Sequence, residues 1–95
     1  GPTAARKLKE ILHNVMYVLA IEMMCAAQAL DFRDEEPGVG VKAAYREIRK
    51  VVSPMKKDRI LYPDIQAIYE KIANWEILKA VEREIGEIKL RWREA

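Results

Sequence analysis

The sequence has 95 residues, of which 51% are hydrophobic and 34% are charged. A chain of this length forms one domain with a modest core, and its apolar content is too high for a disordered protein. The formal net charge of +2 is the difference between 17 basic and 15 acidic side chains. The two signs alternate along the sequence, which excludes the one-signed surface of a nucleic-acid-binding protein. Cys25 is the only cysteine, so no internal disulfide forms and we expect a cytoplasmic protein.

The first predicted element is a long helix over residues 3–30. Its segment 11–30 reads ILHNVMYVLAIEMMCAAQAL, with apolar residues on every side of the helix. Such a helix is normally enclosed by protein, so it indicates a crowded helical assembly. A membrane-spanning helix would have this length, but a central carboxylate such as Glu22 costs about 2.5–3.5 kcal/mol to insert into a bilayer. We therefore expect no membrane partner.

Four further segments follow the long helix. Residues 31–40 contain the acids, proline and glycines of a loop, and apolar residues at helical spacing then predict a short helix over 41–52. A connector over 53–62 leads to a helix over 63–73, which begins at a proline. An amphipathic helix over 75–93 ends the chain. No segment alternates with the period of a strand, so the sequence predicts a single all-α domain over 1–95, a small bundle of about four helices.

The last helix carries a heptad-like seam of apolar residues, which are Leu78, Val81, Ile85, Ile88 and Trp92. The seam either packs within the chain or meets a partner chain, and both alternatives stay open. Gly86 lies inside the pattern and makes a break in this helix possible, since glycine costs about 1 kcal/mol there relative to alanine. On the first helix, Val15, Leu19 and Met23 are the residues that we expect to be hidden by self-association.

Residues with catalytic chemistry are nearly absent. His13 and Cys25 are the only histidine and cysteine, so one chain holds neither a zinc site nor an obvious Cys-His pair. Gly38 and Gly40 form a bare GxG that does not follow a strand. We expect no catalytic, cofactor-binding or metal-binding residues.

Glu22 is the one ionisable residue between His13 and Asp31 on the apolar helix. If it is buried, its carboxylate needs a cation or a proton. The preferred interpretation is a structural ion pair with Arg33, with Arg59 or with an arginine of a neighbouring chain. The alternative is a catalytic acid or base.

Three segments together resemble the C-terminal region of aromatic amino-acid ammonia-lyases, with the closest similarity to histidine ammonia-lyase. They are VMYVLAIEMMCAAQALDFR over 15–33, PGVGVKAAYREIRKVV over 37–52 and KKDRILYPDIQAI over 56–68. The resemblance implies an enzyme that eliminates ammonia from an aromatic amino acid, such as histidine to urocanate. It also implies a methylidene-imidazolone electrophile, made by cyclising an internal Ala-Ser-Gly, and a homotetramer with a central helical bundle.

This sequence contains no Ala-Ser-Gly, so no catalytic position of the family is carried over and no cofactor is expected in this chain. We expect a non-catalytic C-terminal fragment of a histidine ammonia-lyase-like enzyme of histidine catabolism, with a structural and oligomerising role. One alternative is a stand-alone helical interaction module, natural or engineered. A further alternative is one chain of a split ammonia-lyase. The expected partners are a second copy of the chain and the remainder of such an enzyme.

Overall fold

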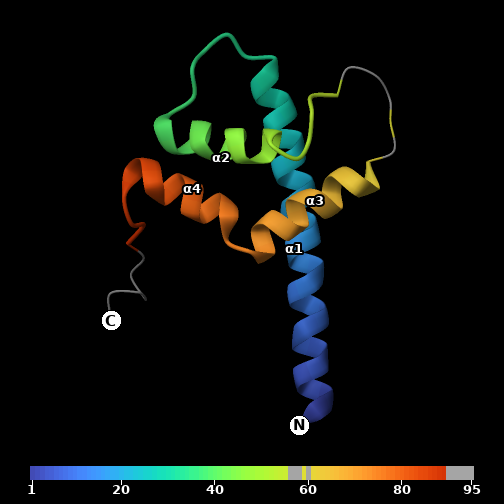
Figure 1. The fold of residues 1–95 in the computed structure, drawn as a ribbon. Helices are drawn as coiled ribbons and strands as arrows, with labels where there is room; N and C mark the ends of the chain where they lie inside the picture. The colour runs from blue at the N-terminus through green and yellow to red at the C-terminus, as the bar shows by residue number, and fades with distance from the viewer. Residues whose placement is uncertain (56–58, 60, 90–95) are drawn as a thin grey trace.

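The computed structural model describes residues 1–55, 59 and 61–89, and this part of the chain forms four α-helices without a strand. In chain order the helices are α1 (Pro2–Asp31), α2 (Val39–Arg49), α3 (Tyr62–Ala73) and α4 (Glu76–Ile85) (Figure 1). The all-α fold with a long, apolar first helix, predicted from the sequence, is confirmed.

The first three helices lie close to their predicted ranges. The loop before α2 is shorter than the expected 31–40, because α2 already begins at Val39, after Gly38 takes an extended backbone conformation. That helix also ends earlier than expected, at Arg49 instead of residue 52. Pro63 occupies the first turn of α3, where its missing N–H costs no helical hydrogen bond.

The fourth helix is shorter than the sequence pattern indicates. The expected range was 75–93, but α4 ends at Ile85, because Gly86 leaves the helical conformation with a φ of 86°. Trp75, just before α4, has a φ of 61°, and the chain bends there between α3 and α4 (Figure 1). Left-handed backbone is unusual for a bulky side chain and is strained. Residues 90–93 of the expected helix lie outside the described residues.

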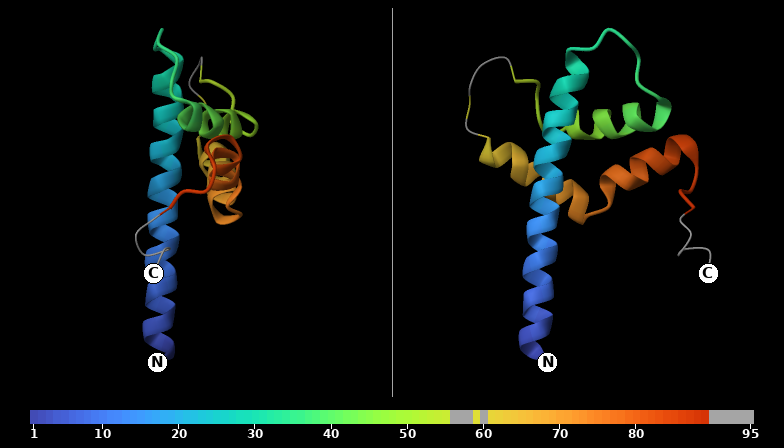
Figure 2. Two further views of the ribbon diagram at one scale, coloured as in Figure 1. Left: turned by 90° about the vertical axis from the view of Figure 1, so that its left-hand side faces the viewer. Right: turned by 180° about the vertical axis from the view of Figure 1, so that it is seen from behind.

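The short helices all lie on one side of α1. Figure 2 shows α2, α3 and α4 stacked beside the long helix, whose N-terminal part projects beyond them. Within this arrangement α1 packs chiefly against α3, and α2 packs chiefly against α4. The opposite side of α1 is covered by no described helix, so the described part of the chain does not provide the enclosure expected for this helix.

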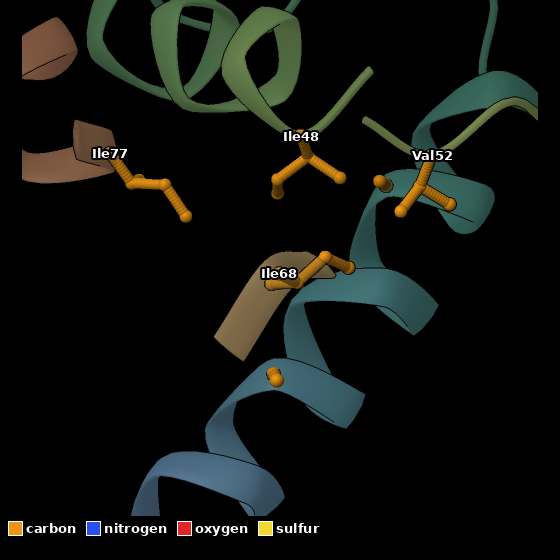
Figure 3. Close-up of a cluster of buried hydrophobic side chains, with 6 residues drawn as sticks. Ile48, Val52, Ile68 and Ile77 are labelled. Carbon is orange, nitrogen blue, oxygen red and sulfur yellow. The ribbon is translucent and has the colours of Figure 1, made fainter. Parts of the chain in front are cut away.

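The core lies where the four helices meet. Ile48, Val52, Ile68 and Ile77 converge on one another from α2, its following loop, α3 and α4 (Figure 3). On α1 the cluster includes only Ala20 and Ala27, whose small side chains allow the other elements to approach closely. The core is therefore small, as the chain length predicts.

We predict that Ile68→Ala lowers the free energy of unfolding by about 2–5 kcal/mol, because Ile68 is fully buried and its truncation leaves a cavity. Urea unfolding followed by circular dichroism measures this change. Ile11→Ala on the exposed side of α1 is the matched control, measured at a protein concentration where the chain is monomeric. There it should change the stability by less than about 0.5 kcal/mol. Equal effects of the two variants would contradict this placement of the core.

Candidate functional site

The helix α1 carries more exposed large apolar side chains than any other described helix. Its exposed large side chains retain between 37% and 67% of their accessible area, and they are Leu8, Ile11, Leu12, Val15, Val18, Leu19 and Ile21. Contiguous exposed apolar surface on a soluble chain marks a site of contact with protein or membrane. By length and composition alone, α1 would also be able to cross a membrane.

The structure divides the predicted oligomer-core residues of α1 between its two sides. Val15 and Leu19 are exposed, whereas Met23 is partly buried and packs against the chain's own core. Self-association through Val15 and Leu19 stays a prediction.

The predicted seam of the last helix lies partly inside the chain. Leu78 and Val81 are half-buried on α4, and Ile88 is half-buried after it. A methyl group added to Gly40 would lie 3.6 Å from the side chains of both Val81 and Ile85, so the first turn of α2 approaches α4 closely. Ile85 nevertheless keeps 52% of its accessible area, so this end of the seam remains open to a partner chain. Trp92 lies outside the described residues.

Glu22 is exposed on the outer side of α1, although its apolar neighbours in the sequence suggested burial. The Nε of Arg59 donates a hydrogen bond to Asp64 at 2.8 Å, so Arg59 pairs within its own segment. Neither Arg33 nor Arg59 forms an ion pair with Glu22 among the residues that the structure describes. An arginine of a neighbouring chain stays the predicted partner.

The side chains capable of catalysis are dispersed. No three metal-ligating side chains cluster in the described ranges. Cys25 is exposed, and His13 forms a hydrogen bond to the hydroxyl of Tyr69, 2.8 Å from its Nδ1. Gly40 of the GxG packs on α4. The described residues thus provide no nucleophile paired with a base.

An aromatic cluster joins α1 to α3. The rings of His13, Tyr17 and Tyr69 pack with centroids 4.6–5.1 Å apart, the two pairs with His13 edge-on, and the Tyr17 hydroxyl donates to the side-chain carbonyl of Gln66. The hydrogen bond between Tyr17 and Tyr62 is the main cause that raises the pKa of Tyr17 to about 12. The sequence analysis did not predict this cluster. The one signal for it was that His13 and Tyr17 are one helical turn apart, which places both rings on the same face of α1.

Beside this cluster, a groove of about 990 Å³ opens between the projecting part of α1 and the end of α3. Its walls are mostly apolar and include Leu12, Met16, Ile72 and Trp75. Its polar lining residues are Arg6, Lys9, Glu10, His13, Asn14 and Tyr69, of which His13 and Tyr69 are hydrogen-bonded to one another.

A buried ion network fastens α2 to α3 and α4. Lys71 Nζ lies 2.9 Å from Glu47 and 3.2 Å from Glu76, and Lys50 lies 2.8 Å from Glu47. Hydrogen bonds from Lys50 and Lys71 lower the pKa of Glu47, while the hydrogen bond to Glu47 raises the pKa of Lys71. Glu47 and Lys71 are both buried, so each charge depends on the other for compensation.

A second polar contact fixes the end of α1. Asp31 accepts hydrogen bonds from Tyr45 and Arg49 of α2, and the Tyr45 hydroxyl is the first cause that lowers the pKa of the Asp31 carboxyl. These contacts are structural. They hold the three short helices against one side of α1 and leave its other side open.

We predict that Glu47→Gln lowers the free energy of unfolding at neutral pH by about 1–3 kcal/mol, because it leaves the buried Lys71 ammonium with only Glu76 as an anionic partner. Chemical unfolding at pH 7 measures the loss. Lys42→Gln, which removes the exposed pair with Glu36, is the control and should cost less than about 1 kcal/mol.

The same pair predicts a pH dependence. A lowered carboxyl pKa stabilises the fold above the ordinary carboxyl range, and this stability is lost as the pH falls below about 4. A raised lysine pKa stabilises the fold below about pH 10, and this contribution is lost at higher pH. Unfolding measured across pH should therefore show a smaller acid loss in Glu47→Gln than in the wild type. Identical acid profiles would contradict the role of this pair.

Comparison with known proteins gives matches along nearly the whole chain. A family model described as aromatic amino acid lyase matches residues 1–50. The chain is 47% identical over 90 residues to the histidine ammonia-lyase of Symbiobacterium thermophilum, covering 94% of this chain and 18% of that protein. It is 40% identical over 82 residues to the histidine ammonia-lyase of Deinococcus radiodurans, covering 86% of this chain and 16% of that protein.

A third relative, the histidine ammonia-lyase of Gloeobacter violaceus, is 43% identical over 89 residues, which are 93% of this chain and 17% of that protein. This chain thus spans less than a fifth of the length of the relatives that it matches. No solved structure matches it.

Proposed function

Because this chain belongs to the aromatic amino acid lyase family, we propose that it is a helical segment of a histidine ammonia-lyase-like enzyme, with a structural and oligomerising role. The proposed reaction of the whole enzyme is the elimination of ammonia from L-histidine to give urocanate, in cytoplasmic histidine catabolism. The names of the similar proteins support this assignment.

The observation that carries the proposal is the exposed apolar side of α1, which lies inside the segment that matches the family model. Burying this side against protein removes apolar surface from water, which is the dominant favourable contribution to most protein association. The proposed partners are the remainder of the enzyme and further copies of this segment.

The chemistry of the chain supports a structural role. The family's methylidene-imidazolone requires an Ala-Ser-Gly, whereas the only serine here, Ser53, lies between Val52 and Pro54. The residues of this chain therefore do not fit that group. Its buried charges, Glu47 and Lys71, are bonded to one another and do not face the groove.

The alternative of a stand-alone module that docks through its last helix has only part of the seam available, since Val81 is half-buried beside α2 whereas Ile85 is exposed. The alternative of a split ammonia-lyase is tested by the same experiment as the preferred role, because in both cases activity requires the remainder of the enzyme to be added to this chain.

The test combines this chain with a histidine ammonia-lyase of Symbiobacterium thermophilum truncated to lack the matching region. We predict that the chain alone releases no urocanate, and that adding it to the truncated enzyme restores urocanate formation and the size of the assembly. Ultraviolet absorbance and light scattering measure the two effects. Val15→Asp on the exposed side of α1 should prevent the restoration by burying a charge.

Arg83→Ala, an exposed change on α4, is the matched control and should restore activity as the wild type does. Release of ammonia from histidine by the purified chain alone would contradict the structural role. If the Val15→Asp chain restored urocanate formation as well as the wild-type chain does, the role of the α1 surface would be contradicted.

A further inference from the structure

A cavity of about 280 Å³ lies between the C-terminal half of α1 and the segment that follows α2. Figure 1 shows this segment beside the upper part of α1. Gln28 holds it there, because its Nε2 donates a hydrogen bond to the carbonyl oxygen of Met55 at 3.1 Å and its Oε1 accepts one from the Met55 N–H at 3.0 Å. Arg49 and Arg59 both line the cavity, so we call it the arginine pocket.

The two guanidinium groups of the arginine pocket are held at neighbouring peptide groups. Nη1 of Arg49 donates to the carbonyl oxygen of Val52 at 3.1 Å, and Nη2 of Arg59 donates to the carbonyl oxygen of Ser53. Nη1 of Arg59 also lies 3.5 Å from the hydroxyl oxygen of Ser53, which lines the pocket as well. Two cations and a hydroxyl group therefore meet on one wall.

Arg49 keeps one donor that these contacts do not use. A guanidinium carries five N–H donors, and the Nε of Arg49 is buried without an acceptor among the described residues. Only 13% of the accessible area of this side chain remains, so solvent does not readily satisfy the Nε–H. A buried donor without an acceptor is unfavourable, and an acceptor supplied by a ligand would relieve that cost.

The rest of the arginine pocket is apolar. Its other walls come from the α1 side chains Met24 and Cys25, from Val52 after α2, and from Met55 and Leu61 before α3. Binding sites for small molecules combine such apolar walls with a few polar groups that fix the orientation of the ligand. The volume lies at the small end of the range for such sites, so the ligand must be small.

We propose that the arginine pocket binds a small monocarboxylate with a short apolar body. The carboxylate accepts a hydrogen bond from the Nε of Arg49 beside the Ser53 and Arg59 wall, and the apolar body lies against Met24, Met55 and Leu61. A carboxylate suits this wall because hydrogen bonds between a guanidinium and a carboxylate are charge-assisted and stronger than neutral ones.

The charges around the pocket favour a single negative charge on the ligand. Arg49 already pairs with Asp31, and Arg59 pairs with Asp64 at 2.8 Å. Two arginines and two carboxylates leave little net positive charge among the described residues, so a dianion such as phosphate would gain less there than a monoanion. The apolar walls would also leave phosphate without contacts for most of its surface.

The first test titrates the chain with benzoate and follows the NMR signal of the Arg49 Nε–H, which is assigned by its loss in Arg49→Lys. We expect the signal to move downfield and to saturate, because the proton gains a carboxylate acceptor. Benzamide, which has the same shape without the charge, and inorganic phosphate, which has no apolar body, should both bind more weakly. A signal that does not move at millimolar benzoate would overturn the inference.

The comparison ligands test its two parts separately. Benzamide that binds as tightly as benzoate would overturn the role of the charge. Phosphate that binds as tightly would overturn the role of the apolar walls.

The second test replaces Arg49 by lysine, which keeps the positive charge but has no Nε–H. Benzoate binding measured by calorimetry should weaken about tenfold, the factor expected for the loss of one charge-assisted hydrogen bond. Arg46→Lys, an exposed change on the same helix, is the matched control and should bind benzoate as the wild type does. Circular dichroism verifies that each variant folds. Equal affinities of Arg49→Lys and the wild type would overturn the assigned contact.

A third measurement locates benzoate in the wild-type chain and therefore needs no variant. Nuclear Overhauser effects should connect the benzoate ring protons to the methyl groups of Met24 and Met55. Met16 lines the separate groove beside the aromatic cluster and is the internal control. Effects to Met16 in place of Met24 and Met55 would place benzoate in that groove and overturn the inference.

The outcome for the proposed function is separate. If the truncated lyase is restored by this chain but benzoate does not bind, the proposed function stands and the carboxylate site fails. If benzoate binds as described but the lyase is not restored, the reverse holds.

Discussion

One-sided packing of α1 is the constraint on which the rest of this structure depends. The helix contributes only two fully buried side chains, Ala20 and Ala27, to a core otherwise built by the three short helices. Small residues at these positions allow close approach but bury little apolar area. Most of the apolar surface of α1 therefore remains in water in the single chain, and its burial requires another protein surface.

Polar contacts keep the short helices on their side of α1. Asp31 holds Tyr45 and Arg49 at one end, and the buried pair of Glu47 with Lys71 ties α2 to α3. A buried ion pair gives little net stability relative to apolar packing, but separating its partners is costly. Such contacts therefore favour one arrangement of the helices, which keeps the outer side of α1 available.

The sequence predicted the fold class and most helix positions because those depend on local signals. The apolar run over 11–30, the proline and glycines after it and Pro63 each act within one or two helical turns. The sequence left the end of α4 open, because glycine weakens a helix without always ending it; in the structure α4 ends at Ile85 and Gly86 leaves the helical conformation. Residues 24 positions apart, such as Glu47 and Lys71, carry no pairing signal in a single sequence.

The exposed apolar surface of α1 was predicted only in part, because it too depends on contacts between segments far apart in the sequence. A helix that is apolar on every side does not reveal which side its own chain will cover, so Val15, Leu19 and Met23 were grouped although Met23 packs inward. Glu22 is exposed, because no described helix covers its side of α1. The family resemblance, by contrast, lay in contiguous segments and was recoverable from the residues themselves.

Hydrogen exchange of the α1 amides as a function of protein concentration tests the central claim most directly. If the outer side of α1 is covered by another protein surface in the assembled state, amides of residues 8–19 should exchange quickly in dilute solution and slowly at high concentration, while those of α3 remain unchanged. Exchange of residues 8–19 that is independent of concentration would contradict the claim.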